Sequence, residues 1–167
     1  MVKLGKGERI SVTLPLSLDE SEILENWPNL TISNARITSI DDRDYNCLAF
    51  VLGDSENFWW PRKEEGIYWP TEYPYINSLP NIQKMLKEKF EFEKCDDEVY
   101  EEGFEKIVIY GEKVSYSPKH YALQLQNGKW KSKLGGLEDI EHDSIDALVG
   151  DFYGKPIAIL KRKLQKI

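Results

Sequence analysis

Two segments joined by Asn127–Gly128 place the strongest constraint on how this chain folds. Residues 120–125 alternate apolar and polar side chains, and residues 129–133 continue the pattern after the turn. Asn-Gly favours a tight two-residue hairpin, because both residues tolerate positive φ angles. Lys106–Tyr110 is rich in β-branched residues, which favours a strand, and residues 153–160 predict a further one. The second half of the chain therefore predicts an antiparallel sheet.

The rest of the chain predicts helices around this sheet. Residues 47–52 are apolar nearly all round, so a helix there should be buried. Residues 80–92 carry apolar side chains at helical spacing, and Pro80 suits the first turn. Residues 17–24 predict a short helix in a leading arm, residues 1–26. We expect the remainder, residues 27–167, to form one domain, since no linker divides it.

Residues 54–80 form a segment rich in aromatic rings and proline. Four prolines argue against regular structure, and a long loop in a compact domain is usually functional. One hypothesis is a substrate-facing wall that includes Trp59, Trp60 and Trp69. The other is aromatic packing that substitutes for secondary structure.

The charge balance narrows the range of partners. The net charge is −7, with 29 acidic against 22 basic residues, which suits neither nucleic acid nor an anionic membrane. The basic cluster Lys161–Lys163 is interpreted as a solvated chain end. No stretch resembles a secretory leader or approaches the length of a membrane span, so we expect a cytoplasmic protein.

The counts of cysteine and histidine argue against metal and disulfide chemistry. Two cysteines cannot make a disulfide framework. They are expected to be reduced thiols, and the alternative is a single disulfide between Cys47 and Cys95. Two cysteines and two histidines without paired spacing do not predict a zinc site. We therefore expect no metal and no cofactor.

Cys47 is the candidate nucleophile. It lies in the first turn of the predicted helix, where unpaired N–H groups and the helix dipole favour a thiolate. Acidic neighbours of Cys95 would raise the pKa of that thiol, which makes it the poorer candidate. The alternative is that Cys47 is an ordinary buried cysteine.

His120 is the candidate base, because it opens a strand and a thiol nucleophile needs a nearby imidazole. Alternatively it is a surface histidine at a strand end. A two-residue hairpin would place Lys133 on the face of His120, whereas a bulge would bring Ser132 inward. His142 lies among acidic residues, where it either orients His120 or caps the next short helix.

These segments resemble a known class of enzymes. Tyr45-Asn46-Cys47 followed by an apolar helix is similar to the cysteine motif of NlpC-type, papain-like hydrolases. The wider set of motifs resembles a family of uncharacterised bacterial domains over residues 27–163; it comprises Tyr45–Ala49, Lys106–Gly111, His120–Gln124, Asn127–Gly135 and Glu138–His142.

The resemblance implies particular roles for the matching residues. Cys47 would be the nucleophile and His120 the base, with Ser132 or His142 as the third polar group. Asn46 would help to bind substrate and stabilise the oxyanion, together with the backbone N–H of Cys47. The chain departs from the pattern after the nucleophile, where Leu48–Ala49 replaces the usual Ser-Gly.

We therefore predict an α+β, papain-like (NlpC-type) domain with N-terminal helices packed on an antiparallel sheet. The expected function is a thiol hydrolase or acyltransferase that cleaves an amide or related acyl bond in a peptide-like or acyl substrate. The alternative is a non-catalytic acidic binding module, an immunity or inhibitor-like protein with a protein partner. The sequence does not indicate an oligomeric state.

Overall fold

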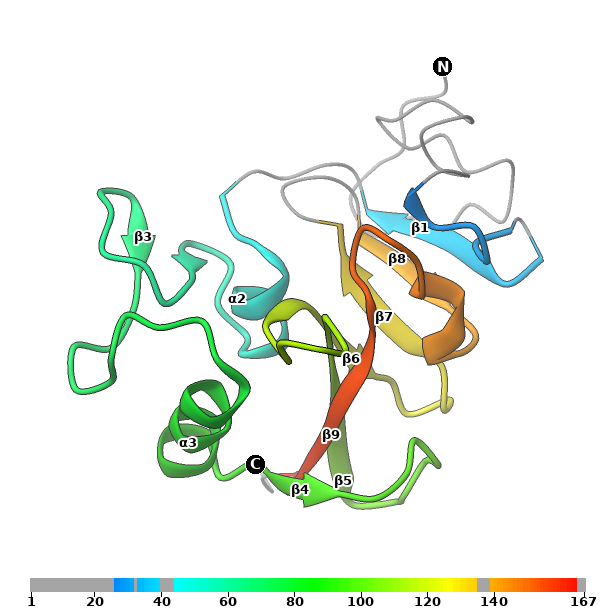
Figure 1. The fold of residues 1–167 in the computed structure, drawn as a ribbon. Helices are drawn as coiled ribbons and strands as arrows, with labels where there is room; N and C mark the ends of the chain where they lie inside the picture. The colour runs from blue at the N-terminus through cyan, green and yellow to red at the C-terminus, as the bar shows by residue number, and fades with distance from the viewer. Residues whose placement is uncertain (1–25, 32, 40–43, 135–138, 165–167) are drawn as a thin grey trace.

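The protein is built on one seven-stranded sheet in which all neighbouring strands are antiparallel (Figure 1). The computed structural model describes residues 26–31, 33–39, 44–134 and 139–164. The strand order is β1-β8-β7-β6-β5-β9-β4. Its strands are β1 (Ala35–Ser39), β4 (Glu93–Cys95), β5 (Phe104–Gly111), β6 (Pro118–Gln124), β7 (Trp130–Lys133), β8 (Asp139–His142) and β9 (Lys155–Lys163).

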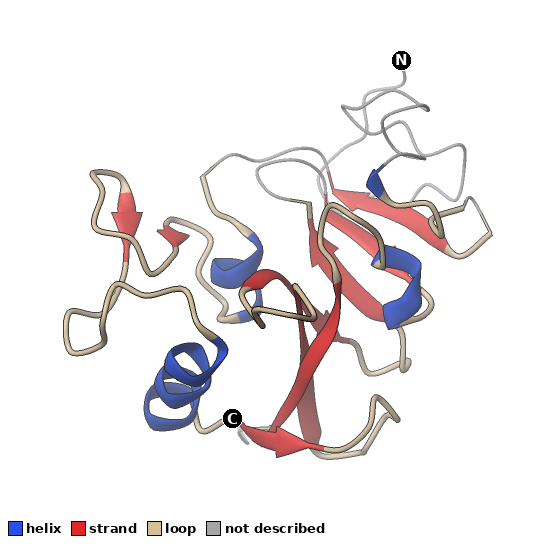
Figure 2. Ribbon diagram, in the orientation of Figure 1, coloured by secondary structure: helices blue, strands red, loops and turns tan. Residues whose placement is uncertain are grey.

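The two α-helices labelled in Figure 1 begin at side-chain caps. In α2 (Cys47–Val51) the Asn46 side chain accepts a hydrogen bond from the Ala49 N–H. In α3 (Leu79–Phe90) Ser78 accepts one from the Asn81 N–H, and a proline occupies the first turn. A 3₁₀ helix, η1 (Ile145–Leu148), lies on the other side of the sheet (Figure 2). The predictions of a helix at 80–92 and of a helix beginning at Cys47 are confirmed.

The predicted papain-like α+β fold is wrong. The described residues form mostly antiparallel sheet with two short α-helices, of five and 12 residues, and they contain no layer of N-terminal helices. The segment 17–24, like nearly all of the predicted arm, lies outside the described residues. The apolar run at Cys47 stops at Gly53, and three prolines follow before α3, so the first half has too few uninterrupted turns for a helical layer.

Side chains alternate between two separate cores on the two faces of the sheet. On one face, here the helix face, α2, α3 and the aromatic segment pack against Ile107, Ile109 and Tyr121. On the other, here the Tyr153 face, Trp27, η1 and Tyr153 pack against a second set: Val108, Tyr110, Ala122, Trp130 and Ile140.

The hairpin between β6 and β7 has a three-residue loop, so the predicted two-residue turn is wrong. Leu125 N–H donates to Lys129 O at 2.7 Å, and Gly128 adopts a φ of +83° at the end of the loop. Ala122 consequently pairs with Ser132. A one-residue change of register moves every side chain to the opposite face. Ser132, not Lys133, therefore shares the face of His120.

The aromatic segment contains two strands of two residues each, β2 (Phe58–Trp59) and β3 (Ile67–Tyr68), which pair in parallel. Residues 60–66 and 69–78 of the segment are loop and turn, in agreement with its proline content. No helix in the described part of the chain is long and apolar enough to cross a membrane.

Candidate functional site

Three of the predicted site residues form one buried hydrogen-bonded chain. His120 Nε2 lies 3.0 Å from Ser132 Oγ, and Ser132 Oγ lies 2.8 Å from His142 Nε2. His142 Nδ1 in turn lies 2.8 Å from the Ser144 carbonyl oxygen. All three side chains are fully buried on the Tyr153 face. Residues from three adjacent strands, β6, β7 and β8, thus meet at one point.

The Ser144 carbonyl determines the direction of both hydrogen bonds that join His120, Ser132 and His142. A carbonyl only accepts, so His142 carries its proton on Nδ1, and Nε2 of this neutral ring accepts from the Ser132 hydroxyl. Ser132 Oγ then accepts from His120 Nε2–H. His120 Nδ1 is left as a buried acceptor without a hydrogen-bond partner among the described residues.

The two imidazoles are held in their neutral form. Burial lowers the pKa of His120 well below its ordinary value, and the nearby His142 lowers it further. Burial also lowers the pKa of His142 to about 4, against smaller opposing effects of the Ser144 carbonyl and Asp143. The His120 ring is stacked on Tyr153 at 3.9 Å between centroids, and Tyr110 lies 5.5 Å away. Near neutral pH these rings are uncharged hydrogen-bonding groups inside an aromatic core.

Cys47 belongs to the core on the opposite, helix face. Its side chain is 5% exposed. Burial raises the pKa of the thiol to about 11, although the backbone N–H groups of Tyr121 and Leu48 and the nearby Lys133 lower it. Among the described residues no hydrogen bond joins Cys47 to His120. The structure therefore does not show the predicted thiol–imidazole pair, even though Tyr121 directly follows His120.

Asn46, the predicted oxyanion and substrate residue, makes structural hydrogen bonds. Besides capping α2, its Oδ1 accepts from Trp59 N–H at 3.1 Å and its Nδ2 donates to Trp59 O at 2.9 Å. The side chain thus joins the helix to β2. A buried amide with these partners is not directed at a substrate.

The three predicted substrate-binding tryptophans mainly pack within the helix face. Trp59 donates to Asp54 Oδ2 at 2.8 Å, and Trp69 donates to Pro74 O at 3.1 Å. The Trp60 ring meets Tyr121 edge-on at 6.2 Å. Of the two alternatives for this segment, aromatic packing describes these contacts better than an open substrate wall.

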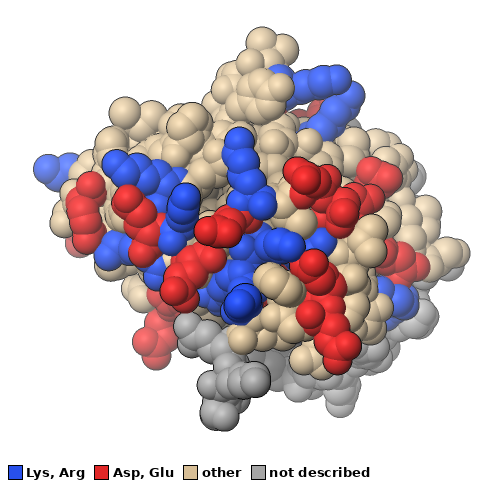
Figure 3. All heavy atoms as spheres, turned by 90° about the horizontal axis from the view of Figure 1, so that it is seen from below, with Lys and Arg blue, Asp and Glu red and all other residues tan. Residues whose placement is uncertain are grey.

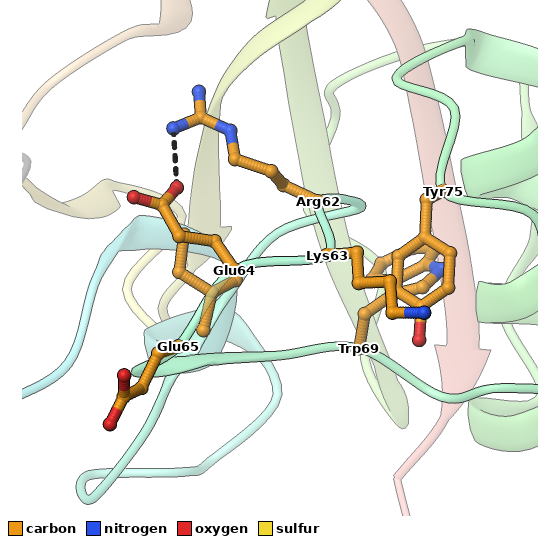
Figure 4. Close-up of a pocket in the computed structure, with 7 residues that line it drawn as sticks. Arg62, Lys63, Glu64, Glu65, Trp69 and Tyr75 are labelled. Carbon is orange, nitrogen blue, oxygen red and sulfur yellow. Dashed lines mark hydrogen bonds and ion pairs between the residues drawn. The ribbon is translucent and has the colours of Figure 1, made fainter.

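One cavity of about 290 Å³ does open in this segment (Figure 4). Trp69 forms part of its wall, with Tyr75 and Lys63 beside it in Figure 4. Arg62 and Glu64 form an ion pair of 3.0 Å on its rim. Two basic and two acidic side chains line the cavity, so it has no net charge preference. The lining residues are Arg62, Lys63, Glu64, Glu65, Ile67, Trp69 and Tyr75.

A buried lysine beside Cys47 was missed by sequence reasoning. Lys133 Nζ lies 3.8 Å from Asp139 Oδ1 and 4.6 Å from the centre of the Tyr45 ring. Its position on the helix face follows from the register of the β6–β7 hairpin. The Asn127–Gly128 pair predicts a different register, because it favours a two-residue turn. Tyr153, the ring stacked on His120, had no local signal either.

The described residues contain no group of three His, Cys, Asp or Glu side chains that could hold a metal ion. Both cysteines are free thiols, Cys47 buried and Cys95 partly exposed.

Comparison with known proteins identifies a family without an assigned activity. The match is to a domain of unknown function (DUF7689) and covers residues 36–161. No curated protein matches the chain, and no solved structure matches it. The family match provides no link to NlpC-type or papain-like hydrolases. Because the match covers well over half of the chain, the protein belongs to the DUF7689 family.

Proposed function

We propose that this protein is a non-catalytic binding module that binds a protein partner. One observation carries the proposal: the candidate nucleophile and the candidate base are buried, uncharged, and lie on opposite faces of the sheet. A Cys/His pair requires the imidazole within hydrogen-bonding distance of the sulfur, and a substrate must reach both groups.

The charge state of Cys47 supports the same conclusion. With a thiol pKa of about 11, only about one molecule in 10⁴ carries the thiolate at pH 7. Neutral His120 also lacks the positive charge that stabilises a thiolate in papain-like enzymes. These two features are typical of a cysteine and a histidine that pack in the hydrophobic core and take no part in catalysis.

The surface has features suited to protein contact. Val114 is 95% exposed, and Tyr116, two residues later, is exposed as well. Val99 is 65% exposed, and the next residue, Tyr100, is also exposed. Tyrosine is enriched at protein interfaces. The basic cluster near the C-terminus is partly neutralised, because Lys161 and Arg162 contact glutamates at 2.8 and 2.9 Å. That arrangement favours a protein partner over nucleic acid.

We place the protein in the cytoplasm as part of this proposal. Two free thiols, one of them partly exposed, suit a reducing compartment.

Thiol labelling tests whether the protein is catalytic. Iodoacetamide at pH 6, with peptide mapping by mass spectrometry, should modify Cys47 only when the protein unfolds globally. Cys95, which is partly exposed, provides the internal comparison. Labelling of folded Cys47 faster than that of a free thiol, and its loss in His120→Ala, would overturn the proposal and favour the hydrolase.

A thiol hydrolase or acyltransferase remains the second candidate because of one observation. Cys47 opens α2, and the backbone N–H groups of Tyr121 and Leu48 favour its thiolate. The labelling rate of Cys47 decides between the two candidates.

The binding half of the proposal has a separate test. A photo-crosslinking residue in place of Tyr100 or Tyr116 should form a defined adduct with one protein, whereas the same residue in place of Phe50 should not. The adduct should persist in Cys47→Ala, since the thiol has no role in binding. An adduct that requires Cys47 would contradict the proposal.

A further inference from the structure

A cavity of about 390 Å³ between α3 and β4 combines an apolar floor with a basic rim. Phe92 and Leu160 form the floor, and both belong to the core of the helix face. The rim consists of Gln83, Lys84, Lys87, Glu93 and Lys94. We name this cavity the lysine pocket.

Few carboxylates among the described residues balance the charges of the lysine pocket. Lys84, Lys87 and Lys94 form no ion pair with any described residue, and Glu93 is the only carboxylate in the lining. Lys87 also lies in the last turn of α3, where a cation is favoured by the helix dipole. A pocket with an apolar floor and three such lysines is complementary to a segment in which carboxylates flank an apolar side chain.

The chain itself displays a segment with this chemistry. The acidic loop, residues 96–102, reads Asp-Asp-Glu-Val-Tyr-Glu-Glu. Its two central side chains, Val99 and Tyr100, are 65% and 38% exposed. Figure 3 shows the molecule from below, where acidic and basic side chains lie next to one another across the surface.

The acidic loop is held in one conformation by buried and partly buried side chains. Lys106 Nζ donates to Asp97 O and Asp97 Oδ1 at 3.1 Å and also to Val99 O. Gln124 Nε2 donates to Glu98 O at 2.8 Å, and Glu101 pairs with Lys161 at 2.8 Å. A preformed loop loses little conformational entropy when it binds.

The loop and the lysine pocket of one molecule lie on opposite faces of the sheet. Lys106 and Gln124 hold the loop. Their neighbours along β5 and β6, Ile107 and Leu123, point to the helix face, so Lys106 and Gln124 themselves point to the Tyr153 face. The pocket floor belongs to the helix face. The loop therefore cannot enter the pocket of its own chain without losing its contacts.

We propose that the acidic loop of one molecule docks in the lysine pocket of a second copy of this chain, so that the protein associates with itself. The inference rests on the proposed binding function and identifies its partner. Reciprocal docking about a two-fold axis gives a closed dimer with two equivalent loop–pocket contacts. The contacts bring opposite charges together, so association weakens as salt rises.

Charge reversal tests the inference with folded variants. The loop variant carries Asp96→Lys, Glu98→Lys and Glu102→Lys, and the pocket variant carries Lys84→Glu, Lys87→Glu and Lys94→Glu. All six side chains are exposed and make no ion pair with a described residue. At about 100 μM, where a dimer with Kd in the tens of micromolar is populated, the wild type should sediment as a dimer. Each variant alone should be monomeric, with at least about tenfold weaker association.

The decisive result comes from mixing the two variants. In the mixed pair both contacts have complementary charges, so an equimolar mixture should restore the dimer and contain one copy of each variant. The matched control carries Lys63→Glu, Lys113→Glu and Lys155→Glu, which changes the net charge equally at distant exposed sites. It should dimerise like the wild type and should pair with the loop variant more weakly than the pocket variant does, because only one of the two contacts then has complementary charges.

Two results would overturn the inference. One is a monomeric wild type at this concentration in low salt, and the other is a mixture that does not associate. Either result leaves the proposed function standing if folded Cys47 resists labelling and the cross-linked partner is a different protein. Fast, His120-dependent labelling of Cys47 would instead remove the proposed function.

Discussion

The Tyr153 ring lies on the His120 ring at 3.9 Å between centroids, with only 8° between the two planes. Tyr153 comes from the segment before β9, whereas His120 is in β6. This stacking closes off one side of the imidazole, and Ser132 occupies Nε2. The residue predicted to be a catalytic base is therefore enclosed on the face away from Cys47, where it stabilises the fold.

Ser132→Ala should destabilise the protein by about 2–4 kcal/mol, because it leaves the His120 donor and the His142 acceptor buried without a partner. Urea unfolding followed by tryptophan fluorescence measures the change. Ser115→Ala is the control, since that exposed serine donates to Glu112 at the surface and should change stability by less than about 0.5 kcal/mol. Equal effects of the two substitutions would contradict a structural role of the His120–Ser132–His142 chain.

Stability should fall as the pH is lowered from about 6.5 toward 4. Both histidines have a folded-state pKa below the unfolded value, and that of His142 is about 4. The unfolded state therefore binds more protons in this range, so the stabilisation is complete above pH 6.5 and is lost toward pH 4. For His142 alone the loss is about 3 kcal/mol.

Unfolding free energies measured between pH 8 and pH 4 check this dependence, and His142→Gln should make it shallower, leaving the part due to His120. A stability that rises as pH falls over this range would show that the histidines are charged in the folded protein.

Cys47→Ser should destabilise the protein more than Cys47→Ala. The thiol lies in an apolar core, where burying the more polar hydroxyl costs about 1–3 kcal/mol that hydrogen bonds from the N–H groups of Tyr121 and Leu48 offset only in part. Thermal unfolding of the two variants side by side gives the comparison. Equal stability of Cys47→Ser and the wild type would mean that the site is more polar than its neighbours indicate.

Lys106→Met should release the acidic loop. The substitution keeps most of the buried side-chain volume but removes the ammonium that donates to Asp97 and Val99. Amide hydrogen exchange of residues 97–100 should accelerate at least about tenfold, whereas exchange in β6 should change little. Self-association should weaken in parallel, because the loop must then be ordered on binding. Unchanged exchange in the loop would show that Lys106 does not hold it.

Local chemistry made several elements predictable. Pro80 and the apolar spacing after it indicated α3, and the apolar run after Asn46 indicated a helix beginning at Cys47. The β-branched run at Lys106–Tyr110 indicated β5. Each of these signals acts within a few residues, through capping, backbone restriction or side-chain shape.

The candidate site was predictable only in part. The sequence predicts Ser132 or His142 as the polar partner of His120, and the structure joins all three by hydrogen bonds. The pairing of His120 with Cys47 depended on the papain-like arrangement, which the structure does not have. In this sheet the two side chains lie on opposite faces.

The sequence by itself determined the identity and approximate extent of β5, β6, β7 and β9, the starts of both α-helices, and the small number of chemically reactive side chains. Tertiary structure decided which of those side chains meet. The loop that ends at Gly128 has three residues, not the two of a tight turn, and this shifts β7 by one position. Ser132 therefore lies beside His120, where a two-residue turn would have placed Lys133. Burial then made Cys47, His120 and His142 neutral, because desolvation depends on the neighbours that the whole fold supplies.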